Sequence, residues 1–197
     1  HKFYVFSDFL PGQHVFALQI ERGFPSLSSY APKSRRCVTT TPLEEFAAFA
    51  LANAALVHPG SSVLDPFAGS CASLLAAAAV SHATVDGNAR STEKTNTVAI
   101  EIDPTVSFED IREDFALRHL PCPTLIRGNC SELSVCLRAL DSNRGEPFDF
   151  IVTDPPYGLR EHLHSSSEHP LAALLQAIAS CLASGTPLLR PDGGRLA

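Results

Sequence analysis

Short apolar runs alternate with longer stretches of helical spacing from residue 62 onward. The apolar runs at 62–64, 97–102, 124–126 and 148–153 predict strands, and the stretches at 70–80, 108–120, 132–140 and 171–182 predict helices. Because strands and helices follow one another strictly, the pattern predicts an α/β fold. Its mostly parallel sheet should carry helices on both faces.

Ahead of these strands, residues 41–57 predict a further helix. Thr41 can cap its amino end, Pro42 suits the first helical position, and Glu44 can close a capping box. A Pro-Gly pair at 59–60 should end it. Upstream, residues 1–36 mix short apolar pieces with glycine, proline and serine, which is typical of a short hairpin or a connector.

The composition bounds what the chain can do. It has 197 residues, 45% hydrophobic and 18% charged, enough for one globular domain with a core of its own. A formal net charge of −6 argues against a protein that holds nucleic acid by bulk electrostatics, because phosphate contacts require clustered basic side chains. The basic side chains are concentrated in residues 1–40, which carry five against two acidic ones. Any role with nucleic acid must therefore rest on a local site.

Neither the cysteines nor the apolar stretches indicate secretion or a membrane. The six cysteines form no C-x-x-C pair, so they fit neither a disulfide framework nor a zinc site, and a cytoplasmic protein with reduced thiols is expected. No apolar stretch approaches the ~20 residues of a membrane span, and no secretory signal opens the chain. His162, His164 and His169 have metal-like spacing, but nothing completes a site. They are expected to line a loop over the substrate, and no metal is predicted.

Polar residues follow each predicted strand, where the carboxyl ends of a parallel sheet bind ligands. Asp65 begins the turn after the first strand, Glu101 lies in the second, Asn129 follows the third, and Asp154 follows the fourth. Each alone could be only a helix cap or a turn residue. Together, a glycine-containing turn and an acid one strand further on predict a site for an adenosine-containing cofactor. The turn allows close backbone approach, and the carboxylate can accept from ribose hydroxyls.

The sequence Asp154-Pro155-Pro156-Tyr157 is the most specific of these elements. The prolines cannot donate backbone hydrogen bonds, so their carbonyls can stand as rigid acceptors beside the Asp154 carboxylate. Tyr157 adds a flat surface for stacking. Such a group suits a planar substrate with an exocyclic amine, whose two N–H groups are bound while its ring is stacked. A proline turn with a core tyrosine is the alternative.

Together these residues resemble the class I S-adenosylmethionine-dependent methyltransferases that modify amino groups. Those enzymes carry an Asp-Pro-Phe-x-Gly-Ser/Thr turn, matched here at 65–70, and an Asp/Asn-Pro-Pro-Tyr/Phe motif, matched at 154–157. Residues 41–67 are similar to the segment that leads into the first strand in the tRNA guanosine-10 N2-methyltransferase family. The upstream segment loosely matches that family's linker at Tyr30, Lys33 and Arg35 or Arg36.

The resemblance implies a role for each matched residue. It places Asp65, Phe67 and Gly69 along the methionine part of S-adenosylmethionine. It also implies that Glu101 holds the ribose, Asn129 meets the adenine amino group and Thr41 lies near the cofactor's tail. Two departures are Cys71, where the family usually has glycine, and a polar insertion at 81–96 that lengthens the connection to Glu101. Pro66 and Ser70 complete the cofactor-binding set, and Asp154, Pro155, Pro156 and Tyr157 form the catalytic floor.

The implied fold is a Rossmann-like class I methyltransferase domain that occupies residues 37–197. It is expected to be truncated and to lack C-terminal strands. Residues 1–36 are then a connector or the remnant of an N-terminal RNA-binding region. The implied reaction is methyl transfer to the exocyclic N2 amine of a guanosine in tRNA. The family's eukaryotic members also require a small zinc-binding activator subunit.

Two alternatives to this function stay open. One is a DNA adenine or cytosine amino-methyltransferase, which shares the Asp-Pro-Pro-Tyr motif but must flip its base from a duplex. The similarity over residues 41–60 argues against it. The other is a non-catalytic pseudo-methyltransferase that serves as a scaffold subunit, for which Cys71 is the best support and the intact motif at 154–158 the main difficulty.

Overall fold

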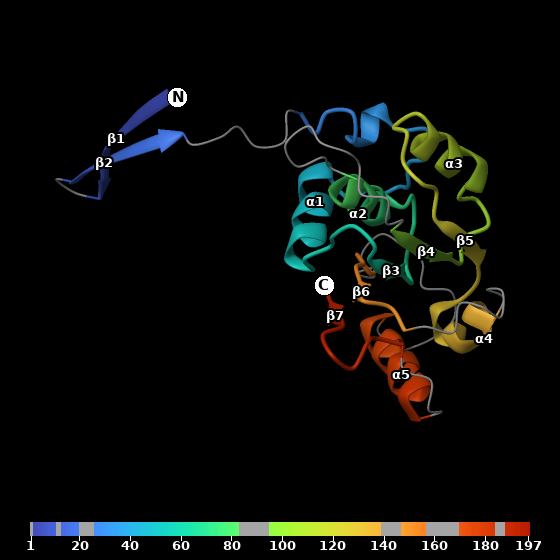
Figure 1. Cartoon of the computed structure of the whole chain (residues 1–197). Coiled ribbons are helices and arrows are strands. Elements are labelled where there is room, and N and C mark those ends of the chain that lie inside the picture. The colour runs from blue at the N-terminus through green and yellow to red at the C-terminus, as the bar shows by residue number, and fades with distance from the viewer. Residues whose placement is uncertain are drawn as a thin grey trace.

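A five-stranded parallel sheet forms the centre of the computed structural model, which describes residues 2–10, 13–19, 26–82, 95–138, 147–156, 170–183 and 188–197 (Figure 1). Its strands are β3 (Ser62–Asp65), β4 (Asn96–Glu101), β5 (Thr124–Arg127), β6 (Phe150–Ile151) and β7 (Arg195–Leu196). Their order is β5-β4-β3-β6-β7, and every neighbouring pair is parallel. Because the chain runs outward from β3 to β5 and then returns beside β3, the strand order reverses between β3 and β6.

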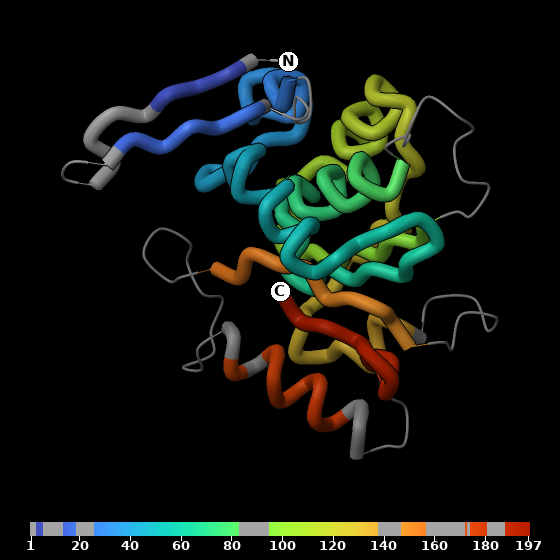
Figure 2. The backbone as a smooth tube through the Cα atoms, turned by 60° about the vertical axis from the view of Figure 1, so that its left-hand side comes forward, coloured from blue at the N-terminus to red at the C-terminus, as the bar shows by residue number. Residues whose placement is uncertain are grey.

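Helices cover both faces of this sheet, as the sequence predicted. They are α1 (Glu45–Ala54), α2 (Ala72–His82), α3 (Phe108–Ala116), α4 (Leu133–Arg138) and α5 (Pro170–Ala183), with 3₁₀ turns η1 (Pro32–Ser34) and η2 (Cys130–Glu132). Figure 2 shows α5 on the opposite side of the sheet from α2. Alternate strand residues divide the core, because Val63 and Ala99 pack with α1, α2 and α3, whereas Leu64 and Val98 pack with α4 and α5. None of the described helices is long and apolar enough to cross a lipid bilayer.

The amino-terminal residues form the predicted hairpin. Its strands β1 (Lys2–Leu10) and β2 (Gln13–Gln19) are antiparallel, and Figure 1 shows them apart from the sheet and its helices. Neither core cluster of the sheet contains a described side chain of the hairpin. An isolated two-stranded hairpin is marginally stable, so the parallel sheet and its helices supply the core.

The helix predicted over 41–57 is shorter at both ends. It spans Glu45–Ala54, and its N-cap is Glu44, without a side-chain capping bond. The prediction that Thr41 and Pro42 start the helix is therefore wrong. Asp114 binds two backbone N–H groups just upstream of Thr41, and this tertiary contact holds the segment against α3 in place of the local capping that the sequence favoured.

The residue that ends α1 predicts a stabilising substitution. Leu56 has φ +63°, a left-handed conformation in which glycine is usual at a helix end. Leu56→Gly is expected to raise the free energy of unfolding by about 0.5–1 kcal/mol. The left-handed form costs a side chain about 1–2 kcal/mol, and glycine's freedom in the unfolded chain offsets part of that gain.

A matched control for Leu56→Gly exists at the end of α3. Leu117 is exposed to the same extent as Leu56, 56%, but has an ordinary helical φ of −59°. Leu117→Gly is therefore expected to lower the free energy of unfolding by about 0.5–1 kcal/mol. Urea unfolding followed by circular dichroism measures both, and equal losses in the two variants would contradict the strain at Leu56.

Candidate active site

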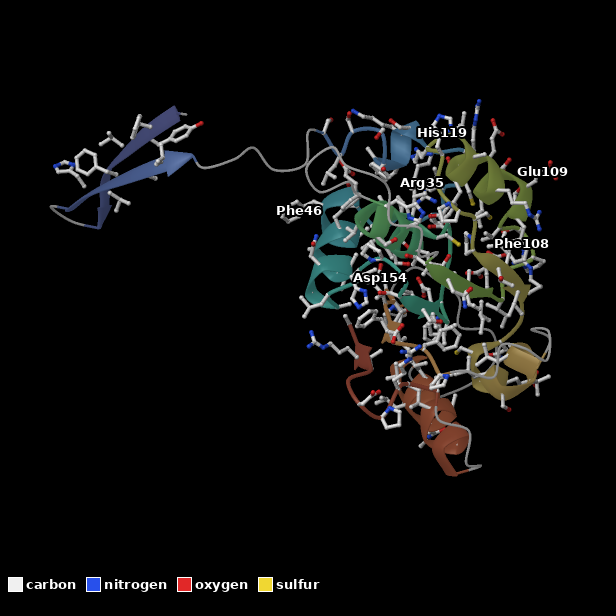
Figure 3. All side chains as sticks on the ribbon, in the orientation of Figure 1. Arg35, Phe46, Phe108, Glu109, His119 and Asp154 are labelled. Atoms are coloured by element: carbon white, nitrogen blue, oxygen red, sulfur yellow. The ribbon has the colours of Figure 1, made fainter. Side chains whose placement is uncertain are left out.

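The carboxyl ends of four strands meet at one edge of the sheet and bring the predicted site residues together there. Asp65 ends β3 and Glu101 ends β4, while Asn129 follows β5 and Asp154 follows β6. Strands β3 and β6 are neighbours, so the loops that follow them flank the point where such sheets bind ligands. Figure 3 shows Asp154 at this edge of the sheet.

The buried side chain of Asp65 stabilises the turn after β3 by hydrogen bonds. It is 1% exposed, and its carboxylate accepts hydrogen bonds from Phe67 N at 3.0 Å, from Thr153 Oγ1 at 2.7 Å and from Ser73 Oγ. Because Thr153 directly precedes Asp154, this carboxylate joins the turn after β3 to the segment after β6. Burial raises the pKa of Asp65 to about 6, against the lowering effect of these hydrogen bonds.

The raised pKa of Asp65 predicts that stability falls as the pH rises. Between about pH 4 and pH 6 the folded state holds this proton more tightly than the unfolded chain does. The stabilisation is fully present below pH 3.8 and is lost above about pH 6, an effect of about 3 kcal/mol. Asp65→Asn, which stays neutral, is expected to lack this decrease in thermal unfolding measured from pH 4 to pH 7. Parallel curves for the parent and the variant would contradict the prediction.

The turn after β3 meets β4 at Glu101, which is 9% exposed. Glu101 Oε2 accepts from Gly69 N at 2.7 Å, and Oε1 accepts from Asp103 N at 2.6 Å. Gly69 has φ +49°, and a Cβ there would lie 3.6 Å from Thr39 Cγ2, an ordinary contact, so the backbone conformation is what calls for glycine. The acid and the turn therefore meet despite the polar insertion at 81–96, of which residues 83–94 lie outside the described part.

Cys71, where the resemblance expects glycine, also has a left-handed φ of +61°. Its side chain is fully buried and belongs to the core cluster shared by α1, α2 and α3. The Cβ therefore packs in the core and is not presented to a cofactor at the surface of the turn. This placement weakens the main support for a scaffold without catalytic function.

Asp154 lines an open pocket of about 460 Å³ whose other walls come from the segment before α1 and its first turn. Asp154, Pro155 and Pro156 are half-buried, while Tyr157 and the histidines that follow it lie outside the described residues. In the described part of the chain, no cluster of three or more His, Cys, Asp or Glu side chains is suited to hold a metal ion. The other lining residues are Thr40, Thr41, Pro42, Leu43, Glu44 and Ala47.

Sequence reasoning placed Thr41 near this site but missed most of the pocket wall around it. Thr-Pro followed by an acid is the local signal of a helix start, and that signal led to the wrong assignment. The structure brings Thr41 and Asp154 to one pocket although they are far apart in sequence. Most of the pocket wall is thus formed by residues 41–44, which the sequence assigned to the start of a helix.

The remaining candidates occupy buried or capping positions. Asn129 Oδ1 accepts from Ser131 N at 3.0 Å and caps η2, so the turn role that the sequence left open is observed. Its contact with adenine stays a prediction. Ser70 is buried and accepts from the guanidinium of Arg35, a residue that sequence reasoning noted only in the linker match. Pro66 is buried as well.

Comparison with known proteins gives one family and two relatives. Residues 32–189 match the family described as UPF0020: RMKL-like, methyltransferase domain. The tRNA (guanine(10)-N(2))-methyltransferase TRMT11 of Rattus norvegicus is 26% identical over 171 residues, which are 82% of this chain and 34% of that protein. The crystal structure of TrmN from Thermus thermophilus is similar with a TM-score of 0.53 and 26% identity, over 80% of this chain and 38% of that one. This chain therefore spans little more than a third of either relative.

Proposed function

Since the chain belongs to the RMKL-like methyltransferase domain family UPF0020, we propose that it transfers a methyl group from S-adenosylmethionine to the exocyclic N2 amine of a guanosine in tRNA. One observation carries the proposal: Asp154 lines an open pocket and directly follows Thr153, which binds the turn after β3 through Asp65. The predicted Rossmann-like fold and the predicted methyltransferase family are both confirmed. The rat relative supports guanine in tRNA as the target.

The residues at the sheet edge suit S-adenosylmethionine, which supplies an electrophilic methyl group on sulfur. Each Glu101 carboxylate oxygen accepts one backbone hydrogen bond. A carboxylate offers about four acceptor positions, so about two remain for the ribose hydroxyls. Asp65, which is buried, supports the turn from behind. The proposed donor site further contains Thr41, Pro66, Phe67, Gly69, Ser70 and Asn129.

Asp154 is the proposed catalytic residue, because it lines an open pocket that an amine could enter. The Asp154 carboxylate and the Pro155 carbonyl accept hydrogen bonds from the two N–H groups of the amine, which aims the nitrogen lone pair at the methyl carbon. Holding the reacting atoms ~3–3.5 Å apart and in line supplies most of the acceleration. As the new C–N bond forms, the bond between the methyl carbon and the sulfonium sulfur would break, and its electron pair would stay on sulfur in S-adenosylhomocysteine. The methylated amine is then acidic, and one proton leaves to Asp154 or to water. Pro156 and Tyr157 complete the proposed catalytic surface, on which the guanine ring of the substrate stacks.

Transfer of labelled methyl groups by the full chain to unmodified tRNA and to duplex DNA tests this function. The assay is run alone and with a small zinc-binding activator subunit of the kind that the resemblance implies. N2-methylguanosine in the digested tRNA is the expected product, with no label in the DNA. Label in adenine or cytosine of the duplex would support a DNA amino-methyltransferase, and absence of S-adenosylmethionine binding by calorimetry would support a scaffold.

We further propose that residues 37–197 carry this chemistry and that residues 1–36 connect it to an RNA-binding region. A cytoplasmic location agrees with the free thiols of the cysteines that the structure describes. The partners in this proposal are the tRNA substrate and an activator subunit.

A further inference from the structure

Arg35 is a buried cation that the proposed reaction does not use. Its side chain is 1% exposed and its Nε lies 3.5 Å from Asp114 Oδ2, an atom of a carboxylate that is itself fully buried. Burial lowers the pKa of Arg35, and the charge of Asp114 opposes that shift. Because desolvation consumes most of the attraction in a buried ion pair, stability alone gives this arrangement little advantage. Figure 3 shows Arg35 between α2 and α3.

The guanidinium of Arg35 binds the turn after β3 at Ser70, the end of the turn farther from the strand. Its Nη1 donates to Ser70 Oγ at 3.2 Å, and its Nη2 donates to the Ser70 carbonyl. Ser70 stands between Gly69 and Cys71, which both have left-handed backbones. Two left-handed residues separated by a single residue need external contacts to hold them, and one of the two here is not glycine. Arg35 supplies such a contact on both oxygens of Ser70.

The orientation of the backbone at Ser70 controls the proposed S-adenosylmethionine site. Gly69 N donates to Glu101 Oε2, so a rotation of the turn at Ser70 would move the donor of that bond. It would also move the backbone that approaches the cofactor. The fork of the guanidinium suits this task, since it can bind two oxygens at once in fixed geometry.

The same cluster also holds the pocket wall. The Asp114 carboxylate accepts from Arg36 N at 2.8 Å and from Cys37 N at 3.0 Å, and the chain then runs directly to Thr40 and Thr41 of the pocket. The Arg35–Asp114 pair therefore joins the turn after β3 to the segment that lines the pocket beside Asp154.

We propose that Arg35 is a positioning residue that holds the turn after β3 in the conformation that binds S-adenosylmethionine. This inference rests on the proposed function. Without Arg35 the turn samples other orientations at Ser70, so a smaller fraction of the folded protein can bind the donor. The chemistry of a bound donor is unchanged.

The test compares Arg35→Gln with Arg36→Gln in the full chain. The Arg36 side chain is 60% exposed and pairs with Glu113 at the surface, so its loss removes the same charge from the next residue without touching the turn. Calorimetry of the folded protein is expected to give a dissociation constant for S-adenosylmethionine about tenfold higher for Arg35→Gln and within twofold of the parent for Arg36→Gln. In the methylation assay, KM for the donor should rise about tenfold while kcat at saturating donor stays within about threefold.

Arg35→Lys keeps the inference testable if Arg35→Gln does not fold. Lysine preserves the charge facing Asp114 but cannot bind both oxygens of Ser70 in fixed geometry, so a rise of about threefold to fivefold in the donor's dissociation constant is expected. A folded Arg35 variant that melts earlier but binds the donor as the parent does would show a merely structural role and overturn the inference. Failure of the parent itself to bind S-adenosylmethionine would instead refute the proposed function.

Discussion

Replacing Asp154 with alanine is expected to lower kcat/KM for methyl transfer about 10³-fold while the dissociation constant of S-adenosylmethionine stays within about twofold. Asp154 lines the pocket that is proposed to admit the amine, whereas the proposed contacts with S-adenosylmethionine come from Glu101 and the turn after β3. Loss of this carboxylate therefore removes an acceptor for an amine N–H group, so the nitrogen lone pair is no longer directed at the methyl carbon. It removes no contact with S-adenosylmethionine. Methyl transfer to unmodified tRNA and calorimetry with the donor measure the two quantities.

Two companion variants of Asp154→Ala separate charge from hydrogen bonding. Asp154→Asn keeps one acceptor oxygen but loses the charge, so an intermediate loss of about 10²-fold is expected. Asp192→Ala removes an exposed carboxyl elsewhere on the chain and is expected to retain parent activity. Turnover by Asp154→Ala at the parent rate would eliminate the proposed catalytic role, and equal losses for alanine and asparagine would show that the charge is what matters.

The sequence predicted correctly those parts of the sheet and of the candidate site that depend on neighbouring residues in the chain. Val63 and Leu64 are followed at once by an acid, a proline, two apolar residues and a glycine, and β3 with its turn is where that pattern predicts. Glu101 ends the next strand along the chain, so the parallel topology alone brings it to the same edge. Side-chain period and turn chemistry act within a few residues, which explains why these elements were predictable.

The parts that the sequence did not reveal depend on partners far away along the chain. Asp114 lies in α3 but binds the backbone of Arg36 and Cys37, and no pattern within either segment indicates the other. That contact fixes the backbone at residues 36 and 37 against α3, just upstream of Thr41, where the local helix signal is not followed. The buried roles of Asp65 and Arg35 are equally invisible, since an acid after a strand or a basic residue in a polar segment is usually exposed.

Exchanging Glu101 for glutamine is expected to raise the dissociation constant of S-adenosylmethionine about 10²-fold. Hydrogen bonds from ribose hydroxyls to a carboxylate are worth about 1.5–3 kcal/mol each, and the neutral amide also loses one acceptor oxygen. Because Gly69 N and Asp103 N both donate to this side chain, one of them loses its acceptor as well. The free energy of unfolding should therefore fall by about 1–3 kcal/mol.

The two effects of Glu101→Gln are separated by measuring donor affinity on folded protein, at a temperature well below its melting point. Glu109→Gln is the matched control, because Glu109 is an exposed acid in the first turn of α3 (Figure 3). It is expected to cost no more than about 1 kcal/mol of stability through the helix dipole and to leave the donor's affinity unchanged. If Glu101→Gln lowered stability alone and bound the donor like Glu109→Gln, the acid would serve only to join the turn after β3 to β4. The ribose would then have to be held by other groups at this edge of the sheet.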